Sequence, residues 1–207
     1  MPIIGITTRI VEIDNKLIEK VSESLIKKVI EVGGVPIIIP YVNEKDINFF
    51  LELCDAFIIP GGFSWHNLDE IIIEYAIIND KPLLGICAGM QGIGNYKNFQ
   101  RSSLSDKTVL IENKEHNSNN EYVHEIIIKG CMLKNILKED KILVNSRHNS
   151  MIVNDDFFDI EAVSPDNVIE AIKVKNKRFI LGVQWHPEDL DDIYSYNIFK
   201  ALIINCK

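Results

Sequence analysis

Short apolar runs alternate with helical patterns in the first half of the chain, and this rhythm constrains the fold more than any other feature. The apolar runs lie at residues 3–7, 35–40, 55–60 and 82–86, and helical spacing follows at 16–32, 44–53, 68–79 and after residue 87. Strands that are apolar throughout leave no side for water, so they are typical of a parallel sheet that helices cover on both faces. The sequence therefore predicts an α/β fold, a three-layer sandwich around a central, mostly parallel sheet of the flavodoxin-like kind.

The rhythm changes after about residue 97. Residues 107–112 and 122–129 are predicted to pair as antiparallel strands around a polar tip at 113–121, which leaves His116 solvated and makes His124 a structural residue of the second strand. Further strands are predicted at 142–145, 160–164, 168–174 and 179–185, and a closing helix at 189–206. No linker divides the chain, so we expect one domain over residues 1–207 with an antiparallel excursion from the main sheet.

Composition excludes several classes of partner. The net charge of -8 and the lack of a basic stripe argue against nucleic acid and against an acidic membrane surface. No apolar run approaches the length of a membrane span. The four cysteines (Cys54, Cys87, Cys131 and Cys206) are widely separated, which fits a reducing cytoplasm rather than disulfides. No His, Cys or Asp group has metal-ligand spacing and no glycine loop is suited to phosphate, so neither metal nor cofactor is expected.

One cysteine stands at a turn that suits a nucleophile. The apolar run 82–86 ends at Cys87, with Gly85 and Gly89 on either side and a helical pattern just beyond. Small neighbours allow a sharp turn that holds the cysteine in a strained backbone conformation. The start of the helix favours the thiolate, the form that attacks carbonyl carbons. The alternative for such a cysteine taken alone is a small buried hydrophobe.

A base and its orienting carboxylate follow about a hundred residues later, in the run Trp185–Glu188. His186 and Glu188 are two residues apart at the end of a predicted strand, so they project to the same side. Glu188 can then hold one imidazole nitrogen while the other faces Cys87. The two motifs together, each after a strand, favour a Cys87–His186–Glu188 catalytic triad over two unrelated strand ends.

The motifs resemble those of class I glutamine amidotransferase-like proteins, most closely the γ-glutamyl hydrolase branch, peptidase family C26. The matching segments are Pro2–Thr7, Gly33–Ile37, Pro60–Gly62, Gly85–Gln91, Val144–His148 and Gly182–Glu188. The resemblance implies that Cys87 attacks the side-chain amide of a γ-glutamyl group. His186 would then protonate the departing amine, and water would hydrolyse the γ-glutamyl thioester.

The resemblance also implies a set of substrate contacts. The oxyanion hole would use the backbone N–H groups of Ala88 and Gly62. Substrate-binding residues would be Gly61, Gln91, Asn145, Ser146, Arg147 and His148. Alternatives stay open for several of them: a plain turn at Gly61 and Gly62, a helix-surface amide at Gln91, a solvated Arg147 and a structurally satisfied His148. Trp65 and His66 either shape the leaving-group site or pack at its rim.

Departures from the branch leave the leaving group open. Residues 63–68 differ from the usual pattern after the Pro-Gly-Gly loop, and Ala88 stands where the branch usually has an arginine. We expect a hydrolase that releases glutamate and an amine from a small γ-glutamyl amide. One alternative is a glutaminase subunit that supplies ammonia to a separate synthase partner, and another is an inactive binding protein on the same fold. A homodimer stays open.

Overall fold

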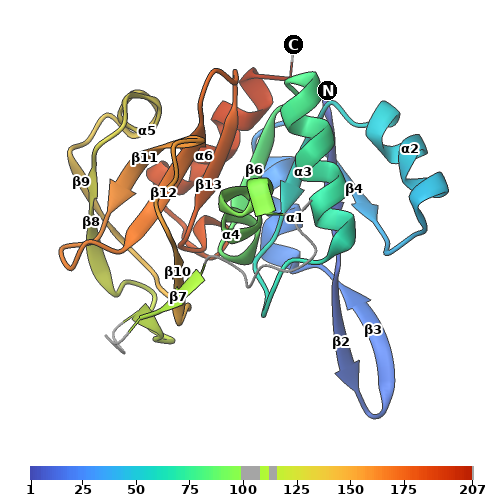
Figure 1. The fold of residues 1–207 in the computed structure, drawn as a ribbon, viewed down its shortest axis with the longest axis horizontal. Helices are drawn as coiled ribbons and strands as arrows, with labels where there is room; N and C mark the ends of the chain where they lie inside the picture. The colour runs from blue at the N-terminus through green and yellow to red at the C-terminus, as the bar shows by residue number, and fades with distance from the viewer. Residues whose placement is uncertain (99–107, 112–115, 207) are drawn as a thin grey trace.

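The computed structural model describes residues 1–98, 108–111 and 116–206, and a nine-stranded sheet runs through it (Figure 1). One half is parallel: β4 (Val35–Ile39), β1 (Ile3–Thr7), β5 (Ala56–Ile59), β6 (Leu83–Ile86) and β13 (Ile180–Val183). The other half continues antiparallel from β13: β12 (Ile169–Val174), β11 (Phe158–Val163), β8 (His124–Ile128) and β9 (Lys141–Val144). The predicted α/β sandwich with an antiparallel excursion is confirmed.

Helices cover both faces of this sheet. One face packs against α1 (Glu23–Glu31), α5 (Cys131–Leu137) and α6 (Ile193–Ile204), and the other against α2 (Glu44–Leu53), α3 (Asn67–Asn79) and α4 (Ala88–Gly94). The strands serve both cores because successive side chains alternate. In β5, Ile58 belongs to the first core, while Phe57 and Ile59 belong to the second.

The predicted helix at 16–32 is wrong in its first part. Residues 9–20 form a hairpin of β2 (Arg9–Ile13) and β3 (Lys16–Lys20), which projects from the body of the molecule (Figure 1). The turn places Asp14 and Asn15 at φ 51° and 59°. Such a pair of positive φ angles is what a two-residue hairpin turn needs, and Asp and Asn tolerate it. The helix begins only at Glu23, where the Ser22 side chain accepts a hydrogen bond from the backbone of Leu25.

The antiparallel excursion pairs differently from the prediction. The short strand β7 (Thr108–Leu110) pairs with β10 (Ser150–Ile152), whereas β8 pairs with β9 and β11. The expected pairing of 107–112 with 122–129 is therefore wrong, and residues 107 and 112–115 lie outside the described ranges.

The sequence patterns also failed to predict helix α5. The closing helix starts later than expected, because Pro187–Asp189 form a 3-10 turn.

Within the described ranges, the structure contains no helix with the length and apolar character to cross a membrane.

Candidate active site

Cys87 stands on a tight turn between β6 and α4. It is 5% exposed, and its backbone has φ 51° and ψ −106°, a conformation that costs a non-glycine residue energy and that the surrounding packing must hold in place. The neighbouring glycines make this packing attainable. A Cβ on Gly89 would lie 2.2 Å from the carbonyl oxygen of Ile59, and one on Gly85 would lie 2.7 Å from the backbone of Gly89.

His186 reaches Cys87 because β13 pairs with β6 in parallel, with Val183 beside Ile86, so both strands end at the same edge of the sheet. The Nδ1 atom of His186 lies 2.8 Å from Oε1 of Glu188. Since a carboxylate only accepts, Nδ1–H is the donor. The imidazole also lies beside Cys87, since a Cβ on Gly61 would meet both Cε1 of His186, at 2.5 Å, and Cβ of Cys87, at 3.3 Å. These contacts bring together the three residues predicted as a triad.

The surroundings of His186 change the pKa of its imidazole. Burial alone lowers the pKa of His186, but the charge of Glu188 and the contact with Cys87 outweigh it and raise this pKa from 6.5 to about 10. The imidazolium is therefore the main form near neutral pH.

Asn145 fixes the backbone of His186 from both sides. Its Oδ1 accepts from the His186 N–H at 2.7 Å, and its Nδ2 donates to the His186 carbonyl at 2.8 Å. Asn145 was predicted to bind substrate. The structure places its fully buried side chain against the backbone of His186.

The Pro60-Gly61-Gly62 loop lies against the triad. A Cβ on Gly61 would lie 2.5 Å from Cε1 of His186 and 3.3 Å from Cβ of Cys87, so only a glycine fits. Arg9 holds this loop by donating from Nε to the carbonyl of Gly61 at 3.2 Å and from Nη2 to that of Pro60. In a trans peptide the C=O and the next N–H point in opposite directions, so these bonds turn the N–H groups of Gly61 and Gly62 away from Arg9.

Sequence patterns missed Arg9, because residues 9–15 were assigned to no element and the second strand of the hairpin, Lys16–Lys20, was taken for part of a helix. The guanidinium is held by Asp69 at 3.0 Å, and Asp69 is fully buried. The Asp69 carboxylate also accepts from the Thr7 hydroxyl at 2.7 Å and from the backbone N–H of His66 at 3.0 Å. A buried, fully bonded ion pair thus supports the loop beside the nucleophile.

A cavity of about 720 Å³ opens over Cys87. Its lining includes these predicted site residues: Gly61, Gly62, Cys87, Gln91, Arg147, His148 and His186. Glu188 borders a smaller adjoining pocket. Ala88 is buried at the first position of α4, where its backbone N–H has no acceptor within the helix.

The other residues that were predicted to contact substrate differ in burial and in the hydrogen bonds that their side chains already make. Gln91 is 9% exposed, and its amide donates to the carbonyl of Ser150 at 3.1 Å and to Gln184 at 3.3 Å. Ser146 is buried and donates to the carbonyl of His116 at 2.7 Å. Arg147 keeps an exposed side chain that pairs with Asp189.

The two rim residues also have partners. Trp65 donates from its indole to Glu70 at 3.1 Å, and it does not line the cavity. His66 does line it, with Nε2 lying 3.1 Å from the carbonyl of Thr8.

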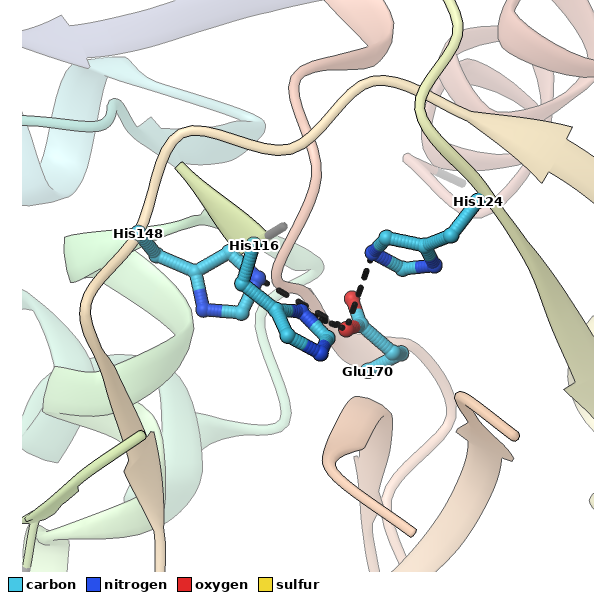
Figure 2. Close-up of side chains that lie close together, drawn as sticks. All are labelled: His116, His124, His148 and Glu170. Carbon is cyan, nitrogen blue, oxygen red and sulfur yellow. Dashed lines mark ion pairs between the residues drawn. The ribbon is translucent and has the colours of Figure 1, made fainter. Parts of the chain in front are cut away.

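Three histidines gather around one carboxylate beside this cavity, which spacing in the sequence did not reveal (Figure 2). His116, His124 and His148 surround Glu170, which is fully buried. The prediction that His116 is solvated is wrong, because only 2% of it is exposed. The four residues come from separate strands and loops that the antiparallel half of the sheet brings to the same edge as Cys87.

Known proteins resemble this chain in sequence and in fold. A γ-glutamyl-γ-aminobutyrate hydrolase of Escherichia coli, PuuD, is 28% identical over 100% of this chain and 94% of its own length. The CTP synthase of Lactobacillus johnsonii is 27% identical over 78% of this chain and 36% of its own length. Among solved structures, the glutaminase domain of Trypanosoma brucei CTPS with bound acivicin has a TM-score of 0.73 at 17% identity, covering 100% of this chain and 94% of that domain.

The family model described as Peptidase C26 matches residues 2–69 and 63–188, which together span most of the chain. Relatives that are named as a hydrolase and as a glutamine amidotransferase-like protein fit the same assignment. The chain therefore belongs to the peptidase C26 family of the class I glutamine amidotransferase-like superfamily, whose general activity is C–N hydrolysis.

Proposed function

We propose that this protein is a cysteine-dependent hydrolase that releases glutamate and an amine from a small γ-glutamyl amide. The observation that carries the proposal is the contact between Cys87 on its strained turn and His186, which Glu188 holds at 2.8 Å. Cys87 and His186 line one cavity and Glu188 borders the adjoining pocket, which supports the roles of nucleophile, base and orienting carboxylate for these three residues.

The chemistry follows from these positions. The Cys87 thiolate attacks the amide carbon, and the C–N bond breaks as the His186 imidazolium gives its proton to the departing amine. Water then attacks the γ-glutamyl thioester and loses a proton to His186, which releases glutamate and frees the thiolate. Each tetrahedral intermediate needs N–H donors for its oxyanion, and we assign these to Ala88 and the Gly61-Gly62 loop.

The cavity supports a substrate larger than glutamine. Its volume of about 720 Å³ is in the range of sites for small organic ligands. Three cationic side chains line it: Arg9, Lys20 and Arg147. Arg9 is already paired with Asp69, whereas the guanidinium of Arg147 has further donors beyond the one that bonds Asp189. We therefore assign the α-carboxylate of the glutamyl group to Arg147.

The test is glutamate release by the purified protein from a panel of amides, with Cys87→Ala as the blank. The panel contains glutamine, γ-glutamyl-GABA, γ-glutamyl dipeptides, γ-glutamyl polyamines and γ-glutamyl nucleotides. Fast release from one γ-glutamyl amide, with glutamine a poor substrate, is the expected result.

Two other results would change the assignment. Slow release from glutamine alone would point to a glutaminase that supplies a separate synthase, a role that the relationship to the CTP synthase glutaminase domain supports. Glutamate release that persists in Cys87→Ala would show that Cys87 is not the nucleophile and would refute the proposal.

A further inference from the structure

The cluster of His116, His124, His148 and Glu170 has no role in the reaction steps proposed above, although His148 also lines the cavity. It is the most concentrated group of buried metal-ligating side chains in the described residues (Figure 2). His116 and His148 are each 2% exposed at the side chain, His124 is 13% exposed, and Glu170 is fully buried. The inward ring nitrogens and both carboxylate oxygens have no hydrogen-bond partner among the described residues. Buried polar atoms are rarely left in that state.

The spacing of these atoms resembles the edges of a metal tetrahedron. Oε1 of Glu170 lies 3.4 Å from Nδ1 of His116 and 3.6 Å from Nε2 of both His124 and His148. Ligands about 2.0–2.1 Å from a tetrahedral zinc lie roughly 3.3–3.4 Å apart. One ligand atom from each residue lies within 4.8 Å of all the others, so small inward movements would complete the coordination.

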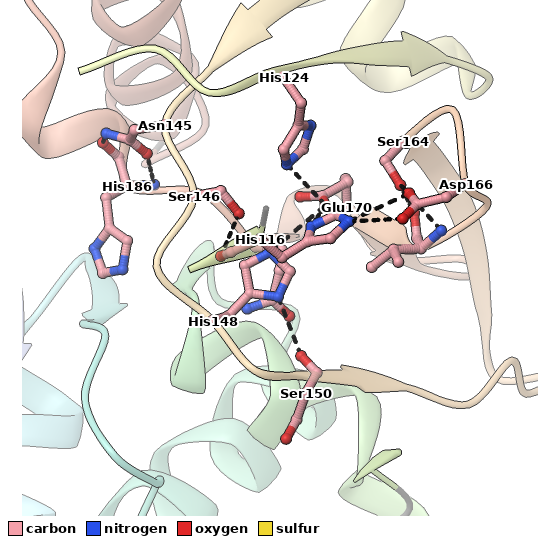
Figure 3. Close-up of polar contacts among 12 residues, drawn as sticks. His116, His124, Asn145, Ser146, His148, Ser150, Ser164, Asp166, Glu170 and His186 are labelled. Atoms are coloured by element: carbon pink, nitrogen blue, oxygen red, sulfur yellow. Dashed lines mark hydrogen bonds and ion pairs between the residues drawn. The ribbon is translucent and has the colours of Figure 1, made fainter. Parts of the chain in front are cut away.

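The outer nitrogen of each ring fixes which way its lone pair points, and Figure 3 shows this contact for His116 and His148. His148 Nδ1 lies 3.2 Å from the carbonyl of Ser150, and His124 Nδ1 lies 3.1 Å from that of Glu125. His116 Nε2 lies 3.1 Å from the carboxylate of Asp166. Carbonyls and carboxylates only accept, so each outer nitrogen carries the hydrogen. A neutral ring then directs a bare lone pair at Glu170.

Protonation of the rings alone cannot give every inward nitrogen of the cluster a good hydrogen bond to Glu170. Three neutral rings would aim three lone pairs at one carboxylate, and three imidazoliums would gather three positive charges in a buried site. A single imidazolium would satisfy only one of the three contacts. A central divalent cation satisfies all three nitrogens and the carboxylate together. The Asp166–His116 pair then becomes the outer carboxylate that commonly supports a metal-bound histidine.

We propose that His116, His124, His148 and Glu170 bind one divalent transition-metal ion, with zinc as the reference ion. Imidazole nitrogens and a carboxylate oxygen are the ligands that such ions accept. Four protein ligands close the coordination sphere, so the ion is structural rather than a Lewis acid for the reaction.

The ion would brace the wall of the catalytic cavity. It would join β8 and β12 to the segment after β9, which carries His148. That segment is also tied to His116, whose carbonyl accepts from the His148 backbone at 2.9 Å and from the Ser146 hydroxyl at 2.7 Å. Asn145, at the start of the same segment, holds His186. The metal site thus lies one short segment away from the catalytic base.

The experiment measures zinc binding in the Cys87→Ala protein, so that the catalytic thiol cannot supply a ligand. Metal is removed with a chelator, Zn²⁺ is added, and bound zinc per chain is measured by mass spectrometry after gel filtration. We expect one zinc per chain and a higher thermal unfolding temperature. Adding His124→Gln, at the most exposed ligand, should abolish stoichiometric binding, whereas adding His66→Gln, at a histidine outside the cluster, should leave it intact.

Two further variants keep the test decisive. Asp166→Asn leaves all four ligands in place and changes a half-exposed residue, so it should fold and should weaken zinc affinity by roughly 10–100-fold. His186→Gln examines the only other candidate ligand group in the described residues, His186, Glu188 and Asp189. Three results would each overturn the proposal. They are zinc binding that persists in His124→Gln, zinc binding that is lost in His186→Gln, and no zinc bound to the Cys87→Ala protein above the level in buffer alone.

Discussion

Replacing Gly61 with alanine should disable the site at a moderate cost in stability. The added Cβ would lie 2.5 Å from Cε1 of His186, about 0.9 Å short of the 3.4 Å at which ordinary contact begins. His186 has little freedom to retreat, because Asn145 holds its backbone on both sides and Glu188 holds its ring. Displacement of a catalytic group by about 1 Å costs on the order of 10²-fold in rate, which equals about 2.7 kcal/mol of barrier.

The assay is kcat/KM on the best substrate of the amide panel, together with the free energy of unfolding in urea. We expect Gly61→Ala to lose about two orders of magnitude in kcat/KM. Its stability should fall by about 1–3 kcal/mol through overpacking, with no added backbone strain because Gly61 does not have a positive φ.

Gly33→Ala is the matched control. Gly33 has φ 90° and open space around its Cα, so alanine there strains the backbone and touches nothing. It should cost about 1–2 kcal/mol of stability and leave kcat/KM unchanged. A Gly61→Ala enzyme with nearly full kcat/KM would refute the placement of His186 against this loop.

Three more predictions follow from the same contacts. Glu188→Gln should lower kcat by less than Cys87→Ala does, because an orienting group usually contributes less than a nucleophile; equal losses would make the carboxylate indispensable. The folded-state pKa of His186 is raised from 6.5 to about 10, so its stabilising contribution is complete below pH 6.5 and is lost as the pH rises toward 10. Urea unfolding should therefore show the wild type losing more stability across this window than His186→Gln, and parallel pH profiles would argue against the charged pair. Arg9→Met should cost about 3–5 kcal/mol, since it leaves the buried Asp69 charge without its partner. Arg9→Met/Asp69→Asn should recover part of that loss in the same measurement, and a double variant as unstable as the single one would contradict this reasoning.

Sequence patterns predicted the elements whose signals are local. The apolar run before Cys87, the glycines around it and the His186–Glu188 pair each occupy a few consecutive residues. Parallel strands bring their carboxyl ends to one edge, so alternation of strands and helices was enough to predict that these two distant motifs meet.

The errors came from signals that are ambiguous or non-local. Leu17 and Val21 fit a helical face, yet Leu17 is 77% exposed on a hairpin. The Asp14-Asn15 turn was the local signal against a helix. The histidine cluster had no such signal, because its members are scattered from residue 116 to 170 and meet only through strand pairing.

The place of β13 in the sheet has a consequence for the order in which the protein can fold. This strand lies between β6 and β12, yet it comes near the end of the chain, with Leu83 paired beside Ile180. A nascent chain lacking β13 has the nucleophile turn without its base, and the two halves of the sheet have no strand between them. Contacts of such long sequence separation form slowly. In the mechanism proposed above, the Cys87 thiol is therefore synthesised long before the strand that carries its base, and hydrolysis has to wait until β13 has paired with β6.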